Sequence, residues 1–224
     1  MLQEMFNASL AVLRRPSVST FEEYERDNAG NAALYVIVGT VIAAILGAIG
    51  FFIKRPYIEA QLRQAQAQLE QLGGNPAGVQ AAFQAFSSPT SLLGAVVGEV
   101  LWALIGFFIW VGLVYLVGRA FGGTGTFGQL AYDVSLFWVP LAVIRALVSL
   151  IAFGPLAVLA GLISLAVGIY NLILTFFGIQ AGMNLPPNKA IIIMLLPLII
   201  SLVICCGLTA LLAPFLIGAG RTAP

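Results

Sequence analysis

The chain has 224 residues, of which 60% are hydrophobic and only 8% are charged. This composition excludes an ordinary water-soluble domain, in which about 25% of residues are charged. The formal net charge of +1 gives no strong field to attract nucleic acid, and the lack of histidine removes the commonest general base and metal ligand. We therefore expect a membrane protein with no metal, no cofactor and no nucleic-acid partner.

The first 31 residues are expected to form amphipathic helices at the membrane surface. Apolar side chains recur there at helical spacing, at Phe6, Leu10 and Leu13. Further on, Thr20 and Glu23 have the spacing of a capping box, in which each side chain satisfies a backbone amide of the other. The sequence therefore predicts a second short helix over residues 21–28.

Five uncharged, apolar stretches are long enough to cross a membrane, which takes roughly 20 residues of helix. They cover residues 32–53, 91–118, 129–153, 155–182 and 188–217. The first is expected to end at Lys54 and Arg55, because the helix-breaking Pro56 follows. Residues 32–217 thus form a predicted five-helix transmembrane domain, and a short tail covers residues 218–224.

Two connections between these stretches are unusual in length. Only Gly154 and Pro155 separate the third stretch from the fourth, so we expect a tight hairpin of antiparallel helices. Residues 54–90 are instead a long polar insertion, whose apolar side chains between residues 58 and 72 follow a two-heptad helical pattern. This extramembrane insertion is interpreted either as a helical hairpin lying on the bundle or as a docking surface for a partner helix.

The predicted fold class is all-α: a polytopic membrane helical bundle with five transmembrane helices and short amphipathic surface helices. Basic residues beside the spans number five on the amino-terminal side and four on the other, which leaves the orientation open. The first group is Arg14, Arg15, Arg26, Arg119 and Lys189, and the second is Lys54, Arg55, Arg63 and Arg221.

Two charged residues fall inside predicted spans at a similar depth. Glu99 lies about two turns into the second span, and Arg145 lies about two turns before the end of the third. Because these spans are antiparallel, both residues approach the same membrane face. A charge at the centre of a lone membrane helix costs roughly 2.5 to 3.5 kcal/mol, so we expect an ion pair between Glu99 and Arg145. The alternative is a path for protons or solutes.

A second set of charges lies near the opposite membrane face. Arg119, Asp133 and Lys189 are close to the ends of the second, third and fifth spans. Charged side chains near the ends of membrane helices reach the polar interface. We therefore expect an interfacial charge cluster of these three residues.

The sequence contains no recognised catalytic motif. Residues 122–126, Gly-Gly-Thr-Gly-Thr, lack the lysine of a phosphate-binding loop and are interpreted as a turn. Cys205 and Cys206 are adjacent in an apolar run and are interpreted as small hydrophobic residues. Only Glu99 and Asp133 could supply acid–base chemistry in the membrane, and they lie near opposite faces. We therefore predict that the protein is not an enzyme.

Three short segments share a pattern with a known family. They are Leu13-Arg14-Arg15-Pro16 followed by Thr20-Phe21, then Gly122-Gly123-Thr124-Gly125-Thr126-Phe127, and finally Tyr170-Asn171-Leu172 with Asn188-Lys189-Ala190. With these segments the chain resembles the Ypt-interacting protein (Yip) family, small five-span membrane proteins with a cytoplasmic amino terminus. The resemblance covers nearly the whole chain.

In eukaryotic secretory membranes the family implies binding of prenylated Rab-type GTPases and a role in vesicle formation. The acidic-Leu-Tyr-Gly-Pro signature of those members is missing before the first span, and residues 54–90 form an unusually long loop. The chain is more similar to the prokaryotic branch, which implies a prokaryotic cytoplasmic membrane with the amino terminus in the cytoplasm. The GTPase role is therefore not carried over.

Two functions from different classes fit the sequence. The first is a non-enzymatic integral membrane scaffold, organiser or accessory subunit of a larger membrane complex, because surface helices accompany a bundle without a continuous polar route. Its expected partners are membrane lipids and either another membrane protein or further copies of the chain. The alternative is a small transporter, channel or lipid scramblase that uses Glu99 and Arg145.

Overall fold

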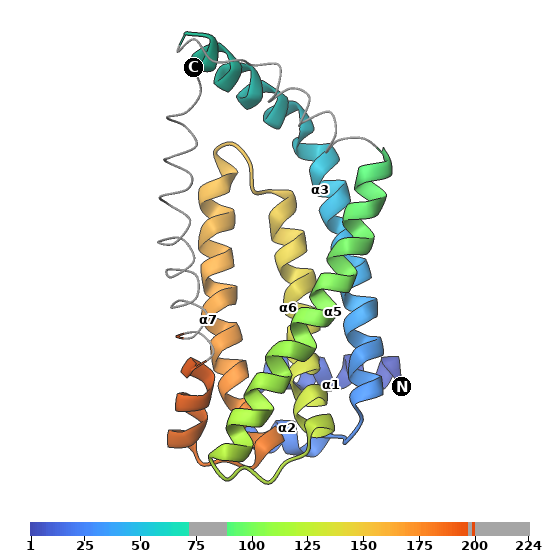
Figure 1. The fold of residues 1–224 in the computed structure, drawn as a ribbon, viewed down its shortest axis with the longest axis vertical. Helices are drawn as coiled ribbons and strands as arrows, with labels where there is room; N and C mark the ends of the chain where they lie inside the picture. Colours follow the sequence, from blue (N-terminus) through green and yellow to red (C-terminus); the bar gives the residue numbers. More distant parts are fainter. Residues whose placement is uncertain (72–88, 197–198, 200–224) are drawn as a thin grey trace, which may run out of the picture.

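The fold is described from a computed structural model of the chain, which defines residues 1–71, 89–196 and 199 (Figure 1). Every regular element within these ranges is an α-helix, which confirms the predicted all-α class for this part of the chain. The helices are α1 (Leu2–Arg14), α2 (Val18–Tyr24), α3 (Ala29–Gln71), α5 (Pro89–Ala120), α6 (Phe127–Leu150) and α7 (Leu156–Met183). A shorter apolar helix, Pro187–Leu196, follows α7.

Four helices are long and apolar enough to cross a membrane. They are Ala29–Gln68 within α3, Leu93–Ala120 within α5, Phe127–Leu150, which is α6, and Leu156–Met183, which is α7. They overlap the first four predicted spans, and Figure 1 shows them running alternately up and down the long axis. The fifth predicted span, residues 188–217, lies mostly outside the described residues, as do the tail, Cys205 and Cys206. The count of five spans therefore stays a prediction.

The first membrane helix does not stop where the sequence suggested. α3 is one helix of 43 residues that passes through Pro56, so the predicted end at Lys54 and Arg55 is wrong. A proline removes one backbone hydrogen bond from a helix. A membrane helix tolerates this loss where neighbouring groups bond the backbone carbonyl that is left without a partner. Lys54 donates to the carbonyl of Ser149 on α6 at 3.2 Å, and Arg55 pairs with Glu59 at 2.9 Å. The extramembrane position of residues 54–71 stays a prediction.

α6 and α7 form the expected antiparallel hairpin. α6 ends at Leu150, α7 begins at Leu156, and the two helices contact each other. Gly154 in the connection has a φ of 53°, a left-handed conformation that glycine adopts without a steric penalty. Figure 1 shows the turn at the top of the bundle, with the two helices descending from it.

α6 is the central helix of the described bundle, because α1, α3, α5 and α7 all contact it. α3 packs tightly against α6 at Gly39, where an added Cβ would lie 2.3 Å from the side chain of Val139. Fully buried side chains gather towards the lower end, where α1 and α2 cross the bundle in Figure 1. They include Met5, Val12, Phe21, Leu130, Phe137, Leu174 and Ile179. The core of the described bundle is therefore centred on the first half of α6, with α1, α2 and α7 packed around it.

The start of α2 also differs from the expectation. α2 begins at Val18, and Ser17 is its N-cap residue, with the Ser17 hydroxyl accepting from the amide of Thr20 at 3.2 Å. The predicted capping box of Thr20 with Glu23 is therefore wrong. Serine is as good an N-cap residue as threonine. Because the helix begins three residues earlier than predicted, Phe21 lies inside α2 and not at its start, and its side chain is buried.

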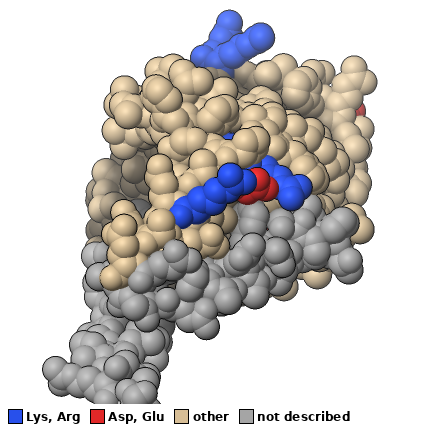
Figure 2. All heavy atoms as spheres, turned by 90° about the horizontal axis from the view of Figure 1, so that it is seen from above, with Lys and Arg blue, Asp and Glu red and all other residues tan. Residues whose placement is uncertain are grey.

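The opposite end of the bundle carries fewer charges among the residues that the structure describes. Figure 2 looks down on this end, where the described surface is mostly uncharged apart from a short stripe of basic and acidic side chains and a basic group at the edge. The last part of α3 leans across it in Figure 1. More of the charged side chains therefore lie at the lower end of the bundle, with α1 and α2.

Candidate functional site at the amino-terminal end of the bundle

The three sequence segments with a family pattern are linked in pairs by hydrogen bonds. The hydroxyl of Tyr170 on α7 donates to the carbonyl of Leu13 at the end of α1. Lys189 donates to the carbonyl of Phe121 at 2.8 Å, directly before the glycine-rich segment. These two hydrogen bonds thus join segments that are far apart in the sequence.

The glycine-rich segment is a turn that lies tightly against the end of α7. Gly122 has a φ of 88°, and an added Cβ at Gly125 would lie 1.9 Å from the carbonyl oxygen of Gly182. At the end of the turn, Thr126 and Gln129 form a capping box that starts α6. The segment therefore fixes the start of α6 against α7, as its interpretation as a turn predicts.

Two of the three residues expected in the interfacial cluster meet at the carboxyl end of α5. Arg119 donates to the carbonyl of Gly123 at 3.3 Å, and Lys189 donates to that of Phe121. The last turn of a helix leaves carbonyls without partners, and cations there also interact favourably with the helix dipole. Arg119 and Lys189 therefore stabilise the connection between α5 and α6.

The third residue, Asp133, forms no ion pair or hydrogen bond with these cations in the described part of the chain, and the three-residue cluster stays a prediction. Its side chain is completely buried, and neither carboxyl oxygen has a hydrogen-bond partner among the described residues. An added Cβ at Gly182 would lie 3.2 Å from Asp133 Oδ2. The charged groups that act on Asp133 are acids of the α2 region, Glu25 and Glu22. The spacing of residues along the sequence could not show that Asp133 is buried. Its burial depends on which side of α6 packs against α7, and this is set by the tertiary structure.

Glu25 is a second acid with incomplete hydrogen bonding. One carboxyl oxygen accepts from the side-chain amide of Gln129 at 3.3 Å, and the other is buried without a partner in the described part of the chain. Burial raises the pKa of the Glu25 carboxyl, and the negative charges of Glu22 and Asp27 raise it further. Within residues 1–71, 89–196 and 199, these acids do not form a metal-binding group of three. The end of the bundle thus holds a pH-sensitive acid.

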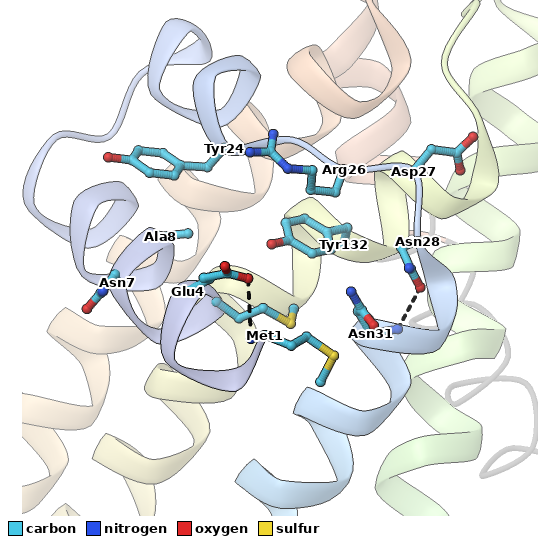
Figure 3. Close-up of a pocket in the computed structure, with 11 residues that line it drawn as sticks. Met1, Glu4, Asn7, Ala8, Tyr24, Arg26, Asp27, Asn28, Asn31 and Tyr132 are labelled. Carbon is cyan, nitrogen blue, oxygen red and sulfur yellow. Dashed lines mark hydrogen bonds and ion pairs between the residues drawn. The ribbon is translucent and has the colours of Figure 1, made fainter.

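A polar pocket of about 700 Å³ opens between α1, α2, the start of α3 and α6. Figure 3 shows side chains from these elements around one hollow, with Tyr132 of α6 at its centre. The polar residues of the lining are Glu4, Asn7, Tyr24, Arg26, Asp27, Asn28, Asn31 and Tyr132. Sequence reasoning missed this pocket because its walls come from four elements. The only signal was the concentration of charges before residue 31.

Glu99 and Arg145 line a different pocket, of about 360 Å³, between α3, α5 and α6. Thr40 and Ser149 contribute hydroxyl groups to the same walls. Both charged side chains are exposed, and the ion pairs formed within the described ranges, Met1 with Glu4 and Arg55 with Glu59, do not include them. The structure therefore brings Glu99 and Arg145 to one pocket without closing the pair, and the ion pair stays a prediction.

Comparison with known proteins adds one finding. A family model described as the Yip1 domain matches residues 10–208, a range that contains all three patterned segments. No match was found among curated proteins or among solved structures.

Proposed function

The chain belongs to the Yip1 domain family, and from this premise we propose that it is a non-enzymatic integral membrane scaffold. In this role it organises other membrane components or serves as an accessory subunit of a larger membrane complex. The observation that carries the proposal is the amino-terminal cap, by which we mean residues 2–28. Eight of the nineteen charged residues of the chain lie within its first 31 positions.

The amino-terminal cap is attached to the bundle through buried contacts. Ser9 and Tyr35 share a buried hydrogen bond of 2.9 Å between α1 and α3. Phe21 of α2 is fully buried and meets Phe137 of α6 edge to face, with 6.1 Å between ring centroids. A surface held in this way is already ordered before a partner arrives, so binding costs little conformational entropy. This favours a docking role for the cap.

The outer surface of the cap offers charges of both signs. Exposed side chains there include Arg14, Arg15, Glu22, Glu23 and Arg26. Complementary charges give specificity and speed of association to protein interfaces. The flanks of the bundle are different, since large apolar side chains such as Trp102 on α5 and Val158 on α7 are 78% and 73% exposed and suit contact with lipid. The cap is therefore where we place a membrane-protein partner or a second copy of the chain.

We also propose that the cap faces the cytoplasm of a prokaryotic cell. Basic residues near membrane helices accumulate on the cytoplasmic side. The proposed orientation puts the end with more basic residues in the cytoplasm, because Arg119 and Lys189 join Arg14, Arg15 and Arg26 there, whereas Lys54, Arg55 and Arg63 are the basic residues of α3 towards the other end. Fusion of a reporter enzyme to the amino terminus would test the orientation.

Extraction of the full chain from its own membrane tests the scaffold role. We expect mass spectrometry after mild-detergent or nanodisc purification to find a protein retained in constant proportion. The double replacement Glu22→Lys with Glu23→Lys should release this protein, because it reverses the charge of the cap surface. Arg63→Glu, far along α3, is the matched control and should leave retention unchanged. A monomer without a stoichiometric partner would contradict the proposal.

A second candidate, a small transporter, channel or lipid scramblase, is supported by the pocket that Glu99 and Arg145 share. Two charges and two hydroxyl groups on the walls of one membrane-level pocket are the beginning of a polar path. Flux through vesicles containing the purified chain would support it if the double replacement Glu99→Gln with Arg145→Gln abolished the flux. The absence of flux, or flux unaffected by the double replacement, would remove its support.

A further inference from the structure

α1 separates two pockets of opposite chemistry. The polar pocket of about 700 Å³ contacts one side of α1, through residues such as Glu4, Asn7 and Ala8. An apolar pocket of about 520 Å³ contacts the other side, through Leu2, Gln3, Phe6, Leu10 and Leu13. The pairing of a charged pocket with an apolar one is the pattern that an amphiphilic ligand requires.

The order of the two pockets matches the depth profile of a membrane. On α3, Asn31 lines the polar pocket, and Tyr35, one turn or about 6 Å further along, lines the apolar pocket. On α6, Tyr132 lines the polar pocket and Val139 the apolar one, about 10 Å further along. Both helices therefore place the polar pocket nearer the bundle end and the apolar pocket nearer the membrane centre.

The polar pocket carries groups for both charges of a zwitterion. Arg26 uses one guanidinium nitrogen on the carbonyl of Glu25, at 2.7 Å, and its remaining donors suit a phosphate. Glu4 points its carboxylate into the hollow in Figure 3, where one of its oxygens lies 3.3 Å from the amino group of Met1, and Asn31 supplies an amide oxygen. These acceptors suit a primary ammonium group, which donates three hydrogen bonds, whereas a quaternary ammonium donates none.

The apolar pocket suits a hydrocarbon chain. Apart from Gln3 and the hydroxyl of Tyr35, its walls are hydrocarbon side chains and backbone, including Val143 and Ile144 of α6. Its rim reaches the flank of the bundle, where Phe6 is 53% exposed and Ile42 is 44% exposed. A chain can therefore enter sideways from the surrounding lipid.

We propose that the two pockets together bind one glycerophospholipid with a primary-amine head group. Its phosphate and ammonium lie in the polar pocket between Arg26 and Glu4. One acyl chain passes the first turn of α1, where Glu4 lines the polar pocket and Leu2 and Gln3 line the apolar one, and fills the apolar pocket. This lipid site is separate from the scaffold role and needs no protein partner.

The test uses the full chain, delipidated in detergent and titrated with phosphatidylethanolamine, and native mass spectrometry counts the lipids retained. Phosphatidylglycerol and phosphatidylcholine with the same acyl chains are the comparison lipids. We expect one tightly held phosphatidylethanolamine. Arg26→Gln should weaken its retention about tenfold or more, because a charge-assisted hydrogen bond contributes about 1.5 to 3 kcal/mol. Arg14→Gln on the exposed side of α1 is the matched control and should change nothing.

A second pair of variants tests the acyl-chain pocket. Val143→Trp fills the pocket and should reduce retention of all three lipids, whereas Val158→Trp, on the lipid-facing side of α7, should have no effect. Because a tryptophan at Val143 can disturb folding, Ile42→Trp at the open rim serves as an independent blocking variant. Equal retention of all three lipids by the unaltered chain, or undiminished retention in Arg26→Gln, would overturn the proposal.

Discussion

Ser9 on α1 and Tyr35 on α3 share a buried hydrogen bond, with 2.9 Å between their hydroxyl oxygens. The bond joins the first surface helix to the first membrane helix across 26 positions of sequence. Tyr170 adds a second link from α7 to the last residues of α1, through the carbonyl of Leu13. The amino-terminal cap is therefore part of the folded bundle, held by these polar contacts together with buried apolar side chains such as Phe21.

The Ser9–Tyr35 bond predicts a non-additive pair of substitutions. Ser9→Ala or Tyr35→Phe alone leaves the other hydroxyl buried without a partner, which costs about 1 to 3 kcal/mol. Removing both hydroxyls should cost less than the sum of the two single changes. Thermal unfolding and hydrogen exchange of α1 amides measure the effect, with the exposed Ser164→Ala on α7 as control. Strictly additive losses would contradict the bond.

The close packing of α6 against α7 at Gly182 predicts that a larger side chain there lowers the stability of the fold. Alanine there would place its Cβ 2.9 Å from the Cα of Leu130 and 3.2 Å from a carboxyl oxygen of Asp133, so the helices must separate. We expect a loss of about 1 to 3 kcal/mol in unfolding free energy. Gly168→Ala, on the same helix with open space around the added Cβ, should be neutral or stabilising by up to about 1 kcal/mol. Equal effects at both positions would show that the close approach is absent.

Glu25 predicts a dependence of stability on pH. Its folded-state pKa is raised, so between its ordinary value and the raised one the folded chain keeps a proton that the unfolded chain has lost. This contribution to stability is complete below the ordinary pKa and is lost as pH rises through the folded-state pKa. Glu25→Gln should flatten the slope of melting temperature against pH, and Glu23→Gln, at an exposed acid in the last turn of α2, should keep it. An unchanged slope in Glu25→Gln would contradict the assignment.

Glu99 and Arg145 predict a charge coupling within the membrane. If the pair closes across its pocket, either single change to glutamine leaves one charge unpaired, at a cost of roughly 2.5 to 3.5 kcal/mol. The double change to glutamine should recover most of the stability. Thermal unfolding of the three variants in nanodiscs measures the coupling. Losses that add up in the double variant would mean that the two charges act independently.

The predicted membrane helices depended on composition alone, which is why the first four could be found from sequence. Runs of apolar residues between charged or turn-forming ones locate a span whatever its neighbours are. The end of α3 was missed for the opposite reason. Whether Pro56 breaks a helix depends on what holds the chain around it, and the contact from Lys54 to Ser149 joins residues 95 positions apart.

The candidate site was only partly predictable. The resemblance drew attention to the segments around Leu13, Gly122 and Tyr170, and the structure shows that Tyr170 bonds to Leu13 and Lys189 to Phe121. The burial of Asp133 and the polar pocket around Tyr132 were not predicted, because both depend on which side of α6 faces α1, α2 and α7. Spacing along one helix gives the depth of a residue in the membrane but not its neighbours.

Site-specific photocross-linking in the native membrane tests the docking role of the amino-terminal cap most directly. A photoreactive amino acid replaces Glu23 on the exposed surface of α2, and in a matched chain it replaces Val158, which is 73% exposed on the flank of α7. A scaffold that docks its partner on the cap predicts one discrete protein adduct from position 23 and lipid adducts from position 158. Lipid adducts alone from both positions would contradict the account.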